Sequence, residues 1–386
     1  MTAGGSAESS GSLGSSGSGG SLDAEVVVIG AGVMGAATAW QLARRGVDVL
    51  LVERFTVGHK HGASHGASRN FNVSYEDEQH LGWLREAAVL WRELEAETGT
   101  DVLTTTGIVN HGPGRDFAQV AAAVSAGGFD TELLDATEAS SRWPGFRFDG
   151  QVLHTPSAGR LHADRAVAGF ADAAAARGAR VREQTRVVGG AVGDDGVEVR
   201  LRDAAGVDDV VRARRAVVTS GAWTSDILLG LQASFTLPAL RVTQEQPAFF
   251  APLDGVDEWP GFNHAPSPDD PATAWFLSGV YGMGSPGEGI KAGWHGVGPE
   301  THPDRRSYEP DPELSALIRR YAREWLPGVD ASAMSEITCT YTSTPDSAFF
   351  LDRVGAVVVG AGFSGHGFKF APVIGRILAD LVADGR

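Results

Sequence analysis

Three glycines and a carboxylate near the start of the chain have the types and spacing of a nucleotide-binding loop. Gly30, Gly32 and Gly35 follow the β-branched run 26–29, and Glu53 ends the next apolar run. In this pattern the first glycine permits a tight turn, the second lets the backbone approach a pyrophosphate, and the third lets a helix lie against the strand. The phosphates then rest on the helix N-terminus, and the acidic residue binds the adenosine ribose. The sequence therefore predicts a site for an adenine dinucleotide.

Lysine is rare in this chain, which makes its positions informative. Of the 32 basic residues only Lys60, Lys291 and Lys369 are lysines, so arginine serves wherever any cation would do. We expect a retained lysine to lie where a compact ammonium is needed and a guanidinium would not fit. Lys60 stands in a polar loop and is interpreted as a surface residue. Lys291 and Lys369 are the candidates for chemistry.

Composition limits the classes of protein to which the chain can belong. The 386 residues are 42% hydrophobic, enough for a large core that we expect to divide into two domains. A net charge of -16 argues against nucleic acid or an anionic membrane as a partner. No apolar run approaches the length of a membrane span. Because Cys339 is the only cysteine, no internal disulfide can form, which fits a cytoplasmic location.

Apolar periodicity predicts the elements that position these residues. Helices are expected over 36–45, 78–97, 160–181, 311–325 and 373–382, strands over 26–29, 47–52 and 356–359, and a meander over 187–218. Between 237 and 294 aromatic and β-branched residues alternate between Pro, Gly and Asp turns, which is typical of an antiparallel sheet. The predicted fold class is therefore α/β, with a Rossmann-like domain and a second, antiparallel-sheet domain.

The expected division of the chain is discontinuous. We assign 23–100, 152–230 and 340–386 to the dinucleotide-binding domain, and 101–151 and 231–339 to a substrate domain. Residues 1–22 are Gly, Ser and Ala without a basic start or an apolar stretch, so we expect a disordered tail rather than a signal peptide. The loop 360–365 also matches the glycine pattern, but the chain ends at Arg386, with no room for a second strand and acid. No separate nicotinamide site is expected.

The stretches above, together with 337–342 (ITCTYT) and 361–369 (AGFSGHGFK), resemble the sarcosine oxidase family of flavoprotein amine oxidases, in the D-amino acid oxidase superfamily. This family includes N-methyltryptophan and pipecolate oxidases, and the resemblance extends from residue 25 to the C-terminus. It implies bound FAD, a two-domain fold, and oxidation of a carbon–nitrogen bond next to a carboxylate, with dioxygen as electron acceptor. It also implies a monomer that needs only a small-molecule amine and dioxygen as partners.

The resemblance assigns roles to individual residues. Cys339 falls where some members form a thioether to FAD; the alternative is a buried small hydrophobe. His65 and Arg69 lie in the loop expected along the flavin. His59, His61 and His65 lack cysteine or carboxylate partners at ligand spacing, so no metal site is expected there. The remaining positions expected to contact the cofactor are Val33, Met34, Arg54, Ser68, Val187, Gly221, Trp223, Gly362, Gly365, His366, Gly367 and Lys369.

Two lysines carry the chemistry that the resemblance implies. Lys291 matches a lysine over the flavin ring, where a preorganised cation stabilises the charge that develops on dioxygen by about 3 kcal/mol. Lys369 matches a lysine that pairs with the substrate carboxylate, and a buried ammonium needs such an anion. Catalytic or wall positions are also expected at Arg69, Tyr281, His295, Tyr341 and His366.

One departure from the family bears on the substrate. Three residues after the loop arginine the family commonly has a second arginine that shares the carboxylate, whereas this chain has Asn72. Losing a charge-assisted bidentate pair costs about 2 to 3 kcal/mol, so sarcosine itself is disfavoured. A bulkier secondary or cyclic amine is predicted, held by Lys369 and by aromatic contacts from Trp275, Phe276 and Trp294.

The predicted reaction converts a neutral amine to an imine, with dioxygen reduced to hydrogen peroxide. Two alternatives stay open at this point. A related flavin dehydrogenase would pass electrons to a protein or quinone and release no peroxide. A non-catalytic nucleotide-binding scaffold would hold FAD without being reduced by any amine.

Overall fold

The computed structural model describes Met1 and residues 22–253 and 258–383. The tail expected over residues 1–22 lies almost wholly outside these ranges, so its disorder stays a prediction. Within the described ranges, no helix is both long and apolar enough to cross a membrane.

An eight-stranded sheet carries the glycine loop. Its path runs β10–β11–β12–β1–β2–β9, and β21 pairs with both β12 and β20. The parallel centre consists of β1 (Ala24–Ile29), β2 (Val49–Val52), β12 (Asp208–Val218) and β21 (Val357–Ala361). The other members are β9 (Arg180–Arg182), β10 (Thr185–Gly193), β11 (Gly196–Asp203) and β20 (Phe350–Val354). Parallel strands are buried on both faces, which explains their continuous Val, Ile and Leu runs.

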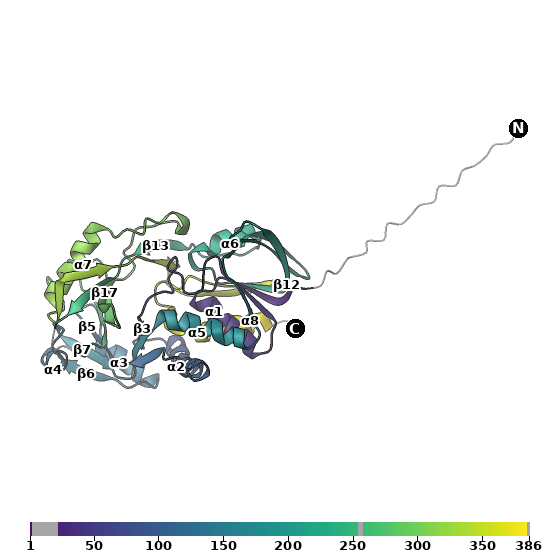
Figure 1. Ribbon diagram of the computed structural model, residues 1–386. Coiled ribbons are helices and arrows are strands. Elements are labelled where there is room, and N and C mark those ends of the chain that lie inside the picture. Colours follow the sequence, from purple (N-terminus) through teal and green to yellow (C-terminus); the bar gives the residue numbers. More distant parts are fainter. Residues whose placement is uncertain (2–21, 254–257, 384–386) are drawn as a thin grey trace.

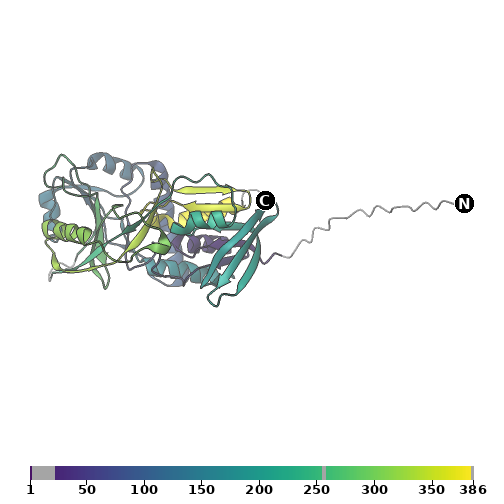
Figure 2. The same ribbon diagram turned by 90° about the horizontal axis from the view of Figure 1, so that it is seen from above.

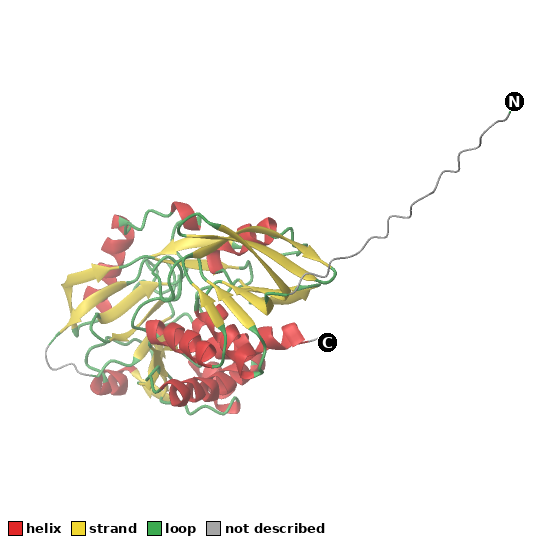
Figure 3. Ribbon diagram, turned by 45° about the vertical axis from the view of Figure 1, so that its right-hand side comes forward, coloured by secondary structure: helices red, strands yellow, loops and turns green. Residues whose placement is uncertain are grey.

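Four helices form a layer beside this sheet. They are α1 (Val33–Arg44), α2 (Glu78–Thr98), α5 (Ala163–Ala176) and α8 (Ala371–Ala383), and α1 and α2 both pack against α5 and α8. Figure 3 shows these helices, in red, gathered on one side of the strands. The Phe170 ring lies 5.3 Å from Trp40 and 5.1 Å from Trp91 between the centroids, so aromatic packing joins α1, α2 and α5.

Two helix predictions have bounds that the structure corrects. The first helix begins at Val33, not at residue 36, because Gly32 already serves as its N-cap. The alanine-rich helix is shorter than 160–181, since its ends belong to β8 (Gly159–Leu161) and β9. The imidazole of His162 caps α5 by accepting a hydrogen bond from Arg165 N at 3.4 Å, and Gly178 leaves the helix with φ +96°.

A second eight-stranded sheet lies at the other end of the molecule. Its order is β18–β14–β17–β16–β15–β5–β7–β6. The strands are β5 (Ile108–His111), β6 (Glu132–Asp135), β7 (Gln151–Thr155), β14 (Ala248–Pro252), β15 (Gly261–His264), β16 (Val280–Ser285), β17 (Gly289–Trp294) and β18 (Val329–Glu336). The pairing is antiparallel as predicted except between β5 and β15, which run parallel. Helix α7 (Pro312–Trp325) covers this sheet through the buried side chains of Ile318, Tyr321 and Trp325.

The smaller elements connect the two large sheets. One small sheet joins β3 (Arg69–Phe71), β4 (Leu103–Thr105) and β8, and another joins β13 (Arg241–Glu245) to β19 (Cys339–Ser343). Strand β13 was expected in the large antiparallel sheet and lies outside it. The remaining helices are α3 (Phe117–Ala126), α4 (Ala136–Arg142), α6 (Thr224–Gly230), η1 (Gly221–Trp223), η2 (Pro303–Arg305) and η3 (Phe368–Phe370).

The two large sheets lie at opposite ends of the molecule. This agrees with the predicted α/β fold class, a Rossmann-like part and an antiparallel-sheet part. Figure 1 shows α7 and β17 at one end and α1, α5, α8 and β12 at the other, and Figure 2 shows the same separation from above. The domain boundaries stay a prediction, and β7 crosses the one expected between residues 151 and 152.

Candidate active site

One cavity of about 480 Å³ extends from the glycine loop to the C-terminal loop. Of the predicted site residues, Gly30, Gly32, Val33, Met34, Glu53, Arg54, Ser68, Arg69, Val187, Gly221, Trp223, Tyr281, Lys291, His295, Cys339, Tyr341, Gly362, Gly365, His366, Gly367 and Lys369 line this cavity. Gly35 and His65 do not. Residues from both large sheets and from the loops between them therefore share one space.

The glycine loop forms a cradle that side chains would fill. Gly30 has φ +97°, and a Cβ atom there would lie 2.9 Å from the carbonyl oxygen of Thr219. A Cβ atom on Gly35 would lie 1.8 Å from the carbonyl oxygen of Gly30, so Gly35 lets α1 pack against the loop without facing the cavity. Gly32 has no side chain to cap α1, and at this N-terminus only Ser64 Oγ is seen to accept from Val33 N, at 3.1 Å, among the described residues. These features fit a pyrophosphate on the helix N-terminus.

Glu53 is fixed at the end of β2, where the predicted ribose site lies. Its carboxylate accepts hydrogen bonds from the backbone N–H groups of Ala31 and Phe55, both at 2.8 Å, and His59 Nε2 lies 3.3 Å away. Burial raises the pKa of this carboxyl group, but the interactions with His59 and the two N–H groups outweigh it and lower the pKa overall. His59, for which the spacing indicated no carboxylate partner, thus contacts the carboxylate of Glu53.

Arg54 and Trp223 lie together at this end of the cavity. Both bind the same carboxylate, because Arg54 Nη1 lies 2.6 Å and Trp223 Nε1 2.8 Å from Asp304 Oδ1. The guanidinium also lies 5.7 Å from the Trp223 ring. Asp304 was not predicted, and it holds β2 and η1 together through their side chains.

Arg69 is held by backbone oxygens and brings a positive charge to the middle of the cavity. Its guanidinium donates to the carbonyl oxygens of Ser68 at 2.8 Å, Ala63 at 2.8 Å and His65 at 2.7 Å. The His65 ring itself is buried behind the loop, and its Nε2 has no hydrogen-bond partner among the described residues. Burial and the charge of Arg69 lower the pKa of His65 to about 3, so this ring is neutral.

Lys291 extends from β17 toward the loop that contains Arg69. The side chain is 4% exposed, and its Nζ donates a hydrogen bond of 3.4 Å to the carbonyl oxygen of Ser68. Burial lowers the pKa of the ammonium to about 7, and the charge of Arg69 adds to this effect. An anion that bound beside Lys291 would raise this pKa again.

Lys369 is the second buried ammonium and lies in η3, directly after the C-terminal glycine loop. It is 5% exposed and donates a hydrogen bond of 2.7 Å to the carbonyl oxygen of His366, while Nζ lies 5.2 Å from the Tyr75 ring. Burial lowers its pKa to about 7. Among the described residues neither Lys291 nor Lys369 forms an ion pair, so both cations are available to ligands.

Tyr75 is a site residue that sequence reasoning missed. It lines the cavity, and its hydroxyl lies 3.2 Å from Nδ1 of His366. Nε2 of His366 lies 3.2 Å from the carbonyl oxygen of Ser347 and must carry the proton, so Nδ1 accepts from the Tyr75 hydroxyl. Burial lowers the pKa of His366 to about 3, which keeps the ring neutral. The only sequence signal was an aromatic residue shortly after Arg69.

The opposite wall consists of aromatic rings around the single thiol. Cys339 begins β19 and is buried, and burial raises its pKa against the lowering influence of Arg69. The His295 ring lies 5.4 Å from Tyr341 and 6.4 Å from Tyr281. These side chains and Cys339 line the same cavity.

The C-terminal glycine loop lines the same cavity and not a second one. Gly362 and Gly365 have φ +69° and +77°, and a Cβ atom on Gly365 would lie 2.1 Å from the Tyr341 ring. The loop continues into η3 and then α8. It therefore closes one end of the predicted dinucleotide site.

The predicted aromatic contacts from Trp275, Phe276 and Trp294 are wrong. None of the three lines the cavity; they pack in the core of the second sheet, where the Phe276 ring lies 5.5 Å from Trp294 and 5.4 Å from Tyr321. Alternation in the sequence indicates that such residues face the inside of the protein. It does not indicate whether they face a hydrophobic core or a cavity. Tyr75, Tyr281, Tyr341 and Phe363 supply the aromatic walls instead.

The fold and this cavity define a dinucleotide-dependent oxidoreductase. A family model described as "FAD dependent oxidoreductase" matches residues 25–381. The chain belongs to this family of FAD-dependent oxidoreductases, which confirms the family that its motifs resemble.

Individual relatives agree with this assignment. A monomeric sarcosine oxidase from Bacillus sp. (strain NS-129) is 32% identical, over 94% of this chain and 93% of the relative. An N-methyl-L-tryptophan oxidase from Yersinia pestis is 27% identical, over 94% and 96%. The solved structure of NikD, described as an unusual amino acid oxidase essential for nikkomycin biosynthesis, has a TM-score of 0.81 and 28% identity, with 95% of each chain covered.

Proposed function

We propose that this protein is an oxidase of carboxylate-bearing secondary or cyclic amines, releasing an imine and hydrogen peroxide. The observation that carries the proposal is the pair of buried ammonium groups, Lys291 and Lys369, in the cavity that also holds the glycine loop. A buried ammonium without a counter-charge is costly, so each is expected to meet an anion when the site is filled. The relatives named as oxidases of sarcosine and N-methyl-L-tryptophan support this chemistry.

The residues present fit FAD. The cradle at Gly30 and the N-terminus of α1, where Gly32 has no side chain, suit the pyrophosphate, and Glu53 suits the adenosine ribose. When bound, FAD accepts a hydride equivalent from the carbon beside the amine nitrogen and delivers the electrons to an acceptor. The chain supplies position and charge for this chemistry.

Cys339 is proposed to hold the cofactor covalently. Its thiol is buried in the cavity, and the positive charges of Arg69 and Lys291 both act to lower its pKa against the effect of burial. A thiolate is the nucleophilic form of cysteine, so these cations favour bond formation. Acid precipitation tests the proposal, because colour that stays with the protein pellet requires a covalent bond.

Lys369 is proposed to bind the substrate carboxylate. One of its N–H groups is used by the carbonyl oxygen of His366, and the other donors of the ammonium are available to an anion. Asn72 lines the cavity in place of a second cation, and its Oδ1 accepts a hydrogen bond from Ser74 N at 3.1 Å. At this position the carboxylate therefore meets an amide and not a second cation, so apolar contacts are proposed to add to the binding energy.

The cavity favours the neutral form of the amine. The positive charges of Arg69, Lys291 and Lys369 line the space that the amine would enter, and nearby cations lower the pKa of a bound ammonium. A neutral nitrogen can donate its lone pair as the adjacent C–H bond breaks, whereas an ammonium cannot. These side chains thereby prepare the substrate for oxidation.

Lys291 is proposed to promote the reaction with dioxygen. Negative charge develops on dioxygen as it is reduced, and a fixed ammonium in a dry site stabilises that charge without reorganisation. Burial of Lys291 and its hydrogen bond to Ser68 hold the cation in place. This role distinguishes an oxidase from a dehydrogenase, which would be reduced by amines but release no peroxide.

The substrate is proposed to be bulkier than sarcosine. Tyr75, Tyr281, Tyr341 and Phe363 line the cavity and can pack against an apolar or cyclic side group. Equal catalytic efficiency on sarcosine and on larger secondary amines would contradict this proposal.

The experiment that tests the proposed function is a peroxide assay on the purified yellow protein with N-methyl and cyclic amino acids. Peroxide in proportion to the amine consumed supports it, and absence of peroxide with every amine contradicts it. We further propose a monomer in the cytoplasm, which the monomeric bacterial relative and the single, unpaired cysteine support.

A further inference from the structure

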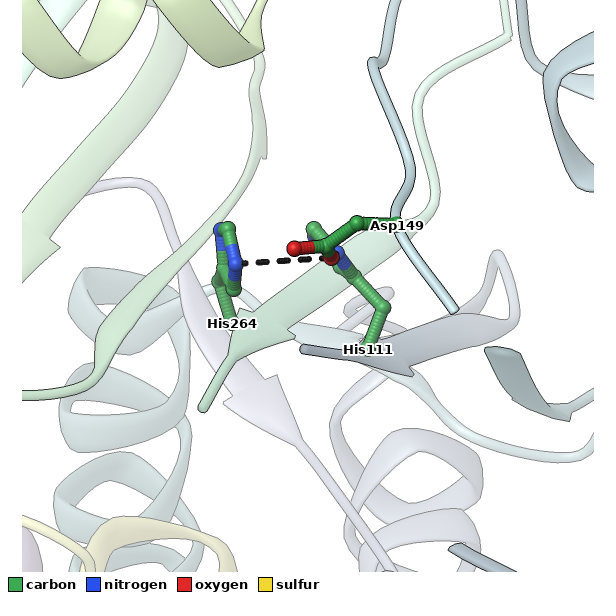
Figure 4. Close-up of side chains that lie close together, drawn as sticks. All are labelled: His111, Asp149 and His264. Atoms are coloured by element: carbon green, nitrogen blue, oxygen red, sulfur yellow. Dashed lines mark hydrogen bonds and ion pairs between the residues drawn. The ribbon is translucent and has the colours of Figure 1, made fainter. Parts of the chain in front are cut away.

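Two histidines and an aspartate meet in the second sheet, outside the proposed active site. His111 ends β5 and His264 ends β15, and the parallel pairing of these strands places the two residues side by side. Their ring centroids lie 4.0 Å apart, and Asp149, just before β7, points between them (Figure 4). None of the three lines the dinucleotide cavity.

Two polar atoms in this cluster are buried without a hydrogen-bond partner in the described part of the chain. They are Nε2 of His264 and Oδ2 of Asp149. The His264 side chain is 0% exposed, and Nδ1 on the other side of its ring lies 3.3 Å from the Tyr321 hydroxyl. Leaving a buried polar atom unsatisfied costs about 1 to 3 kcal/mol. A ligand that bound both atoms would therefore stabilise this arrangement.

Protons alone do not satisfy the cluster. If the His264 proton is on Nδ1, the Nε2 lone pair faces the Asp149 carboxylate, and lone pairs repel. If the proton is on Nε2, it meets Asp149 Oδ1 only at 3.7 Å, beyond hydrogen-bond distance. A cation between the three side chains would give Nε2 of His264 and the Asp149 carboxylate a common partner.

The distances match a metal site. Nδ1 of His111 lies 3.3 Å and Nε2 of His264 3.7 Å from Asp149 Oδ1, and all ligand atoms lie within 4.8 Å of one another. A tetrahedral metal ion with bonds of about 2.0 to 2.1 Å separates its ligand atoms by roughly 3.3 Å. The two nitrogen–carboxylate separations, 3.3 and 3.7 Å, are close to this value.

We propose that His111, Asp149 and His264 bind one divalent transition-metal ion, and that zinc is the preferred ion. Two imidazoles and a carboxylate are ligands that suit zinc, and Asp149 neutralises part of its charge. The hydroxyl of Tyr321 accepts from Nδ1–H of His264 and so fixes the ring with Nε2 toward the ion, as partners of metal-bound histidines do. The Asp149 side chain is 27% exposed, which gives ions and a water ligand access from solvent.

The location indicates a structural role. The ion would join the ends of β5 and β15, the one parallel pair of this sheet, to the segment before β7. It would therefore stabilise the second sheet without contact with FAD or substrate. This site was not expected from the sequence, which predicted no metal.

Zinc content and zinc binding of the full-length flavoprotein test the proposal. Protein purified without chelators is expected to contain one equivalent of zinc by mass spectrometry, and chelated protein is expected to regain thermal stability on addition of Zn²⁺. Asp149→Asn is expected to lower zinc affinity about 100-fold or more, and Tyr321→Phe about 10-fold. The flavin spectrum should be unchanged in both variants, which shows that they fold.

The matched control is His154→Gln. His154 lies on β7 of the same sheet, 3.1 Å from Glu132, and so forms a histidine–carboxylate pair without a second imidazole. Its zinc affinity is expected to equal that of the unchanged protein. A chain that lacks zinc and shows no stabilisation by added Zn²⁺ would overturn the proposal, as would equal zinc binding by Asp149→Asn and the unchanged protein.

Discussion

The ammonium of Lys369, in η3, donates a hydrogen bond of 2.7 Å to the carbonyl oxygen of His366 in the preceding loop. The His366 ring is in turn held by Tyr75 and by the carbonyl oxygen of Ser347. A cation with no counter-charge is thus kept at a fixed place in a buried cavity.

Lys369→Gln should weaken binding of carboxylate-bearing amines more than binding of uncharged amines. Removing the charge deprives the carboxylate of its ion pair, and hydrogen bonds to charged groups contribute about 1.5 to 3 kcal/mol. We expect KM for carboxylated substrates to rise roughly tenfold to a hundredfold. Steady-state kinetics on an amino acid and on its methylamide check this, and an equal loss on both would remove Lys369 from this role.

Lys291→Met should slow oxidation of the reduced enzyme by dioxygen far more than reduction by the amine. Losing one well-placed charge-stabilising group costs about 2.7 to 4 kcal/mol, or roughly a hundredfold to a thousandfold in rate. Stopped-flow measurement of the two half-reactions separates them. Lys60→Met, at an exposed loop lysine, is the control and should change neither rate. Equal slowing of both half-reactions by Lys291→Met would contradict this role.

Gly35→Ala should abolish FAD binding or prevent folding, because its Cβ atom would lie 1.8 Å from the carbonyl oxygen of Gly30. Gly82→Ala in α2 is the control, since its nearest neighbour is the flexible end of Arg85 at 3.6 Å. The flavin content of the two purified variants is compared, and only Gly35→Ala is expected to lack flavin. Normal flavin content in Gly35→Ala would show that the loop differs from the one described.

The flavin-free protein should become more stable as the pH rises from 7 toward 10. Burial lowers the pKa of Lys291 and of Lys369 to about 7 in the folded chain, whereas the unfolded chain binds these protons up to about pH 10.4. Between these values the unfolded state holds more protons, so the free energy of unfolding rises, by up to about 1.4 kcal/mol per pH unit for each lysine.

Urea unfolding of the flavin-free protein at pH 7, 8 and 9 measures how its free energy of unfolding depends on pH. The double variant Lys291→Met, Lys369→Met should show a flatter dependence on pH. A slope that is the same with and without the two lysines would rule them out as its source.

Local motifs made much of the fold and the cofactor site predictable. Gly30, Gly32 and Gly35 lie within six residues of one another, and Glu53 follows the next strand. Their spacing alone therefore predicts that they bind a dinucleotide together. The parallel strands were predictable for the same reason, since burial on both faces produces apolar runs. The C-terminal loop with Lys369 was recognised through its long specific motif.

Features that depend on distant pairing were not predictable. His111 and His264 meet because β5 pairs with β15 in parallel, and no local pattern shows that choice. Tyr75 was missed because one aromatic residue in a connecting segment carries no signal of its orientation. Trp294 was predicted to line the site, whereas it lies in the core of the second sheet. Alternation identifies the buried face of a strand but does not show whether that face borders a core or a cavity.

The most direct test of the central claim follows the flavin colour of the purified full chain during one cycle. A carboxylate-bearing secondary or cyclic amine, added without oxygen, should bleach the visible flavin absorbance, and admission of air should restore it with one hydrogen peroxide per flavin. Protein that holds no flavin, or flavin that no such amine bleaches, would contradict the claim that this cavity oxidises amines.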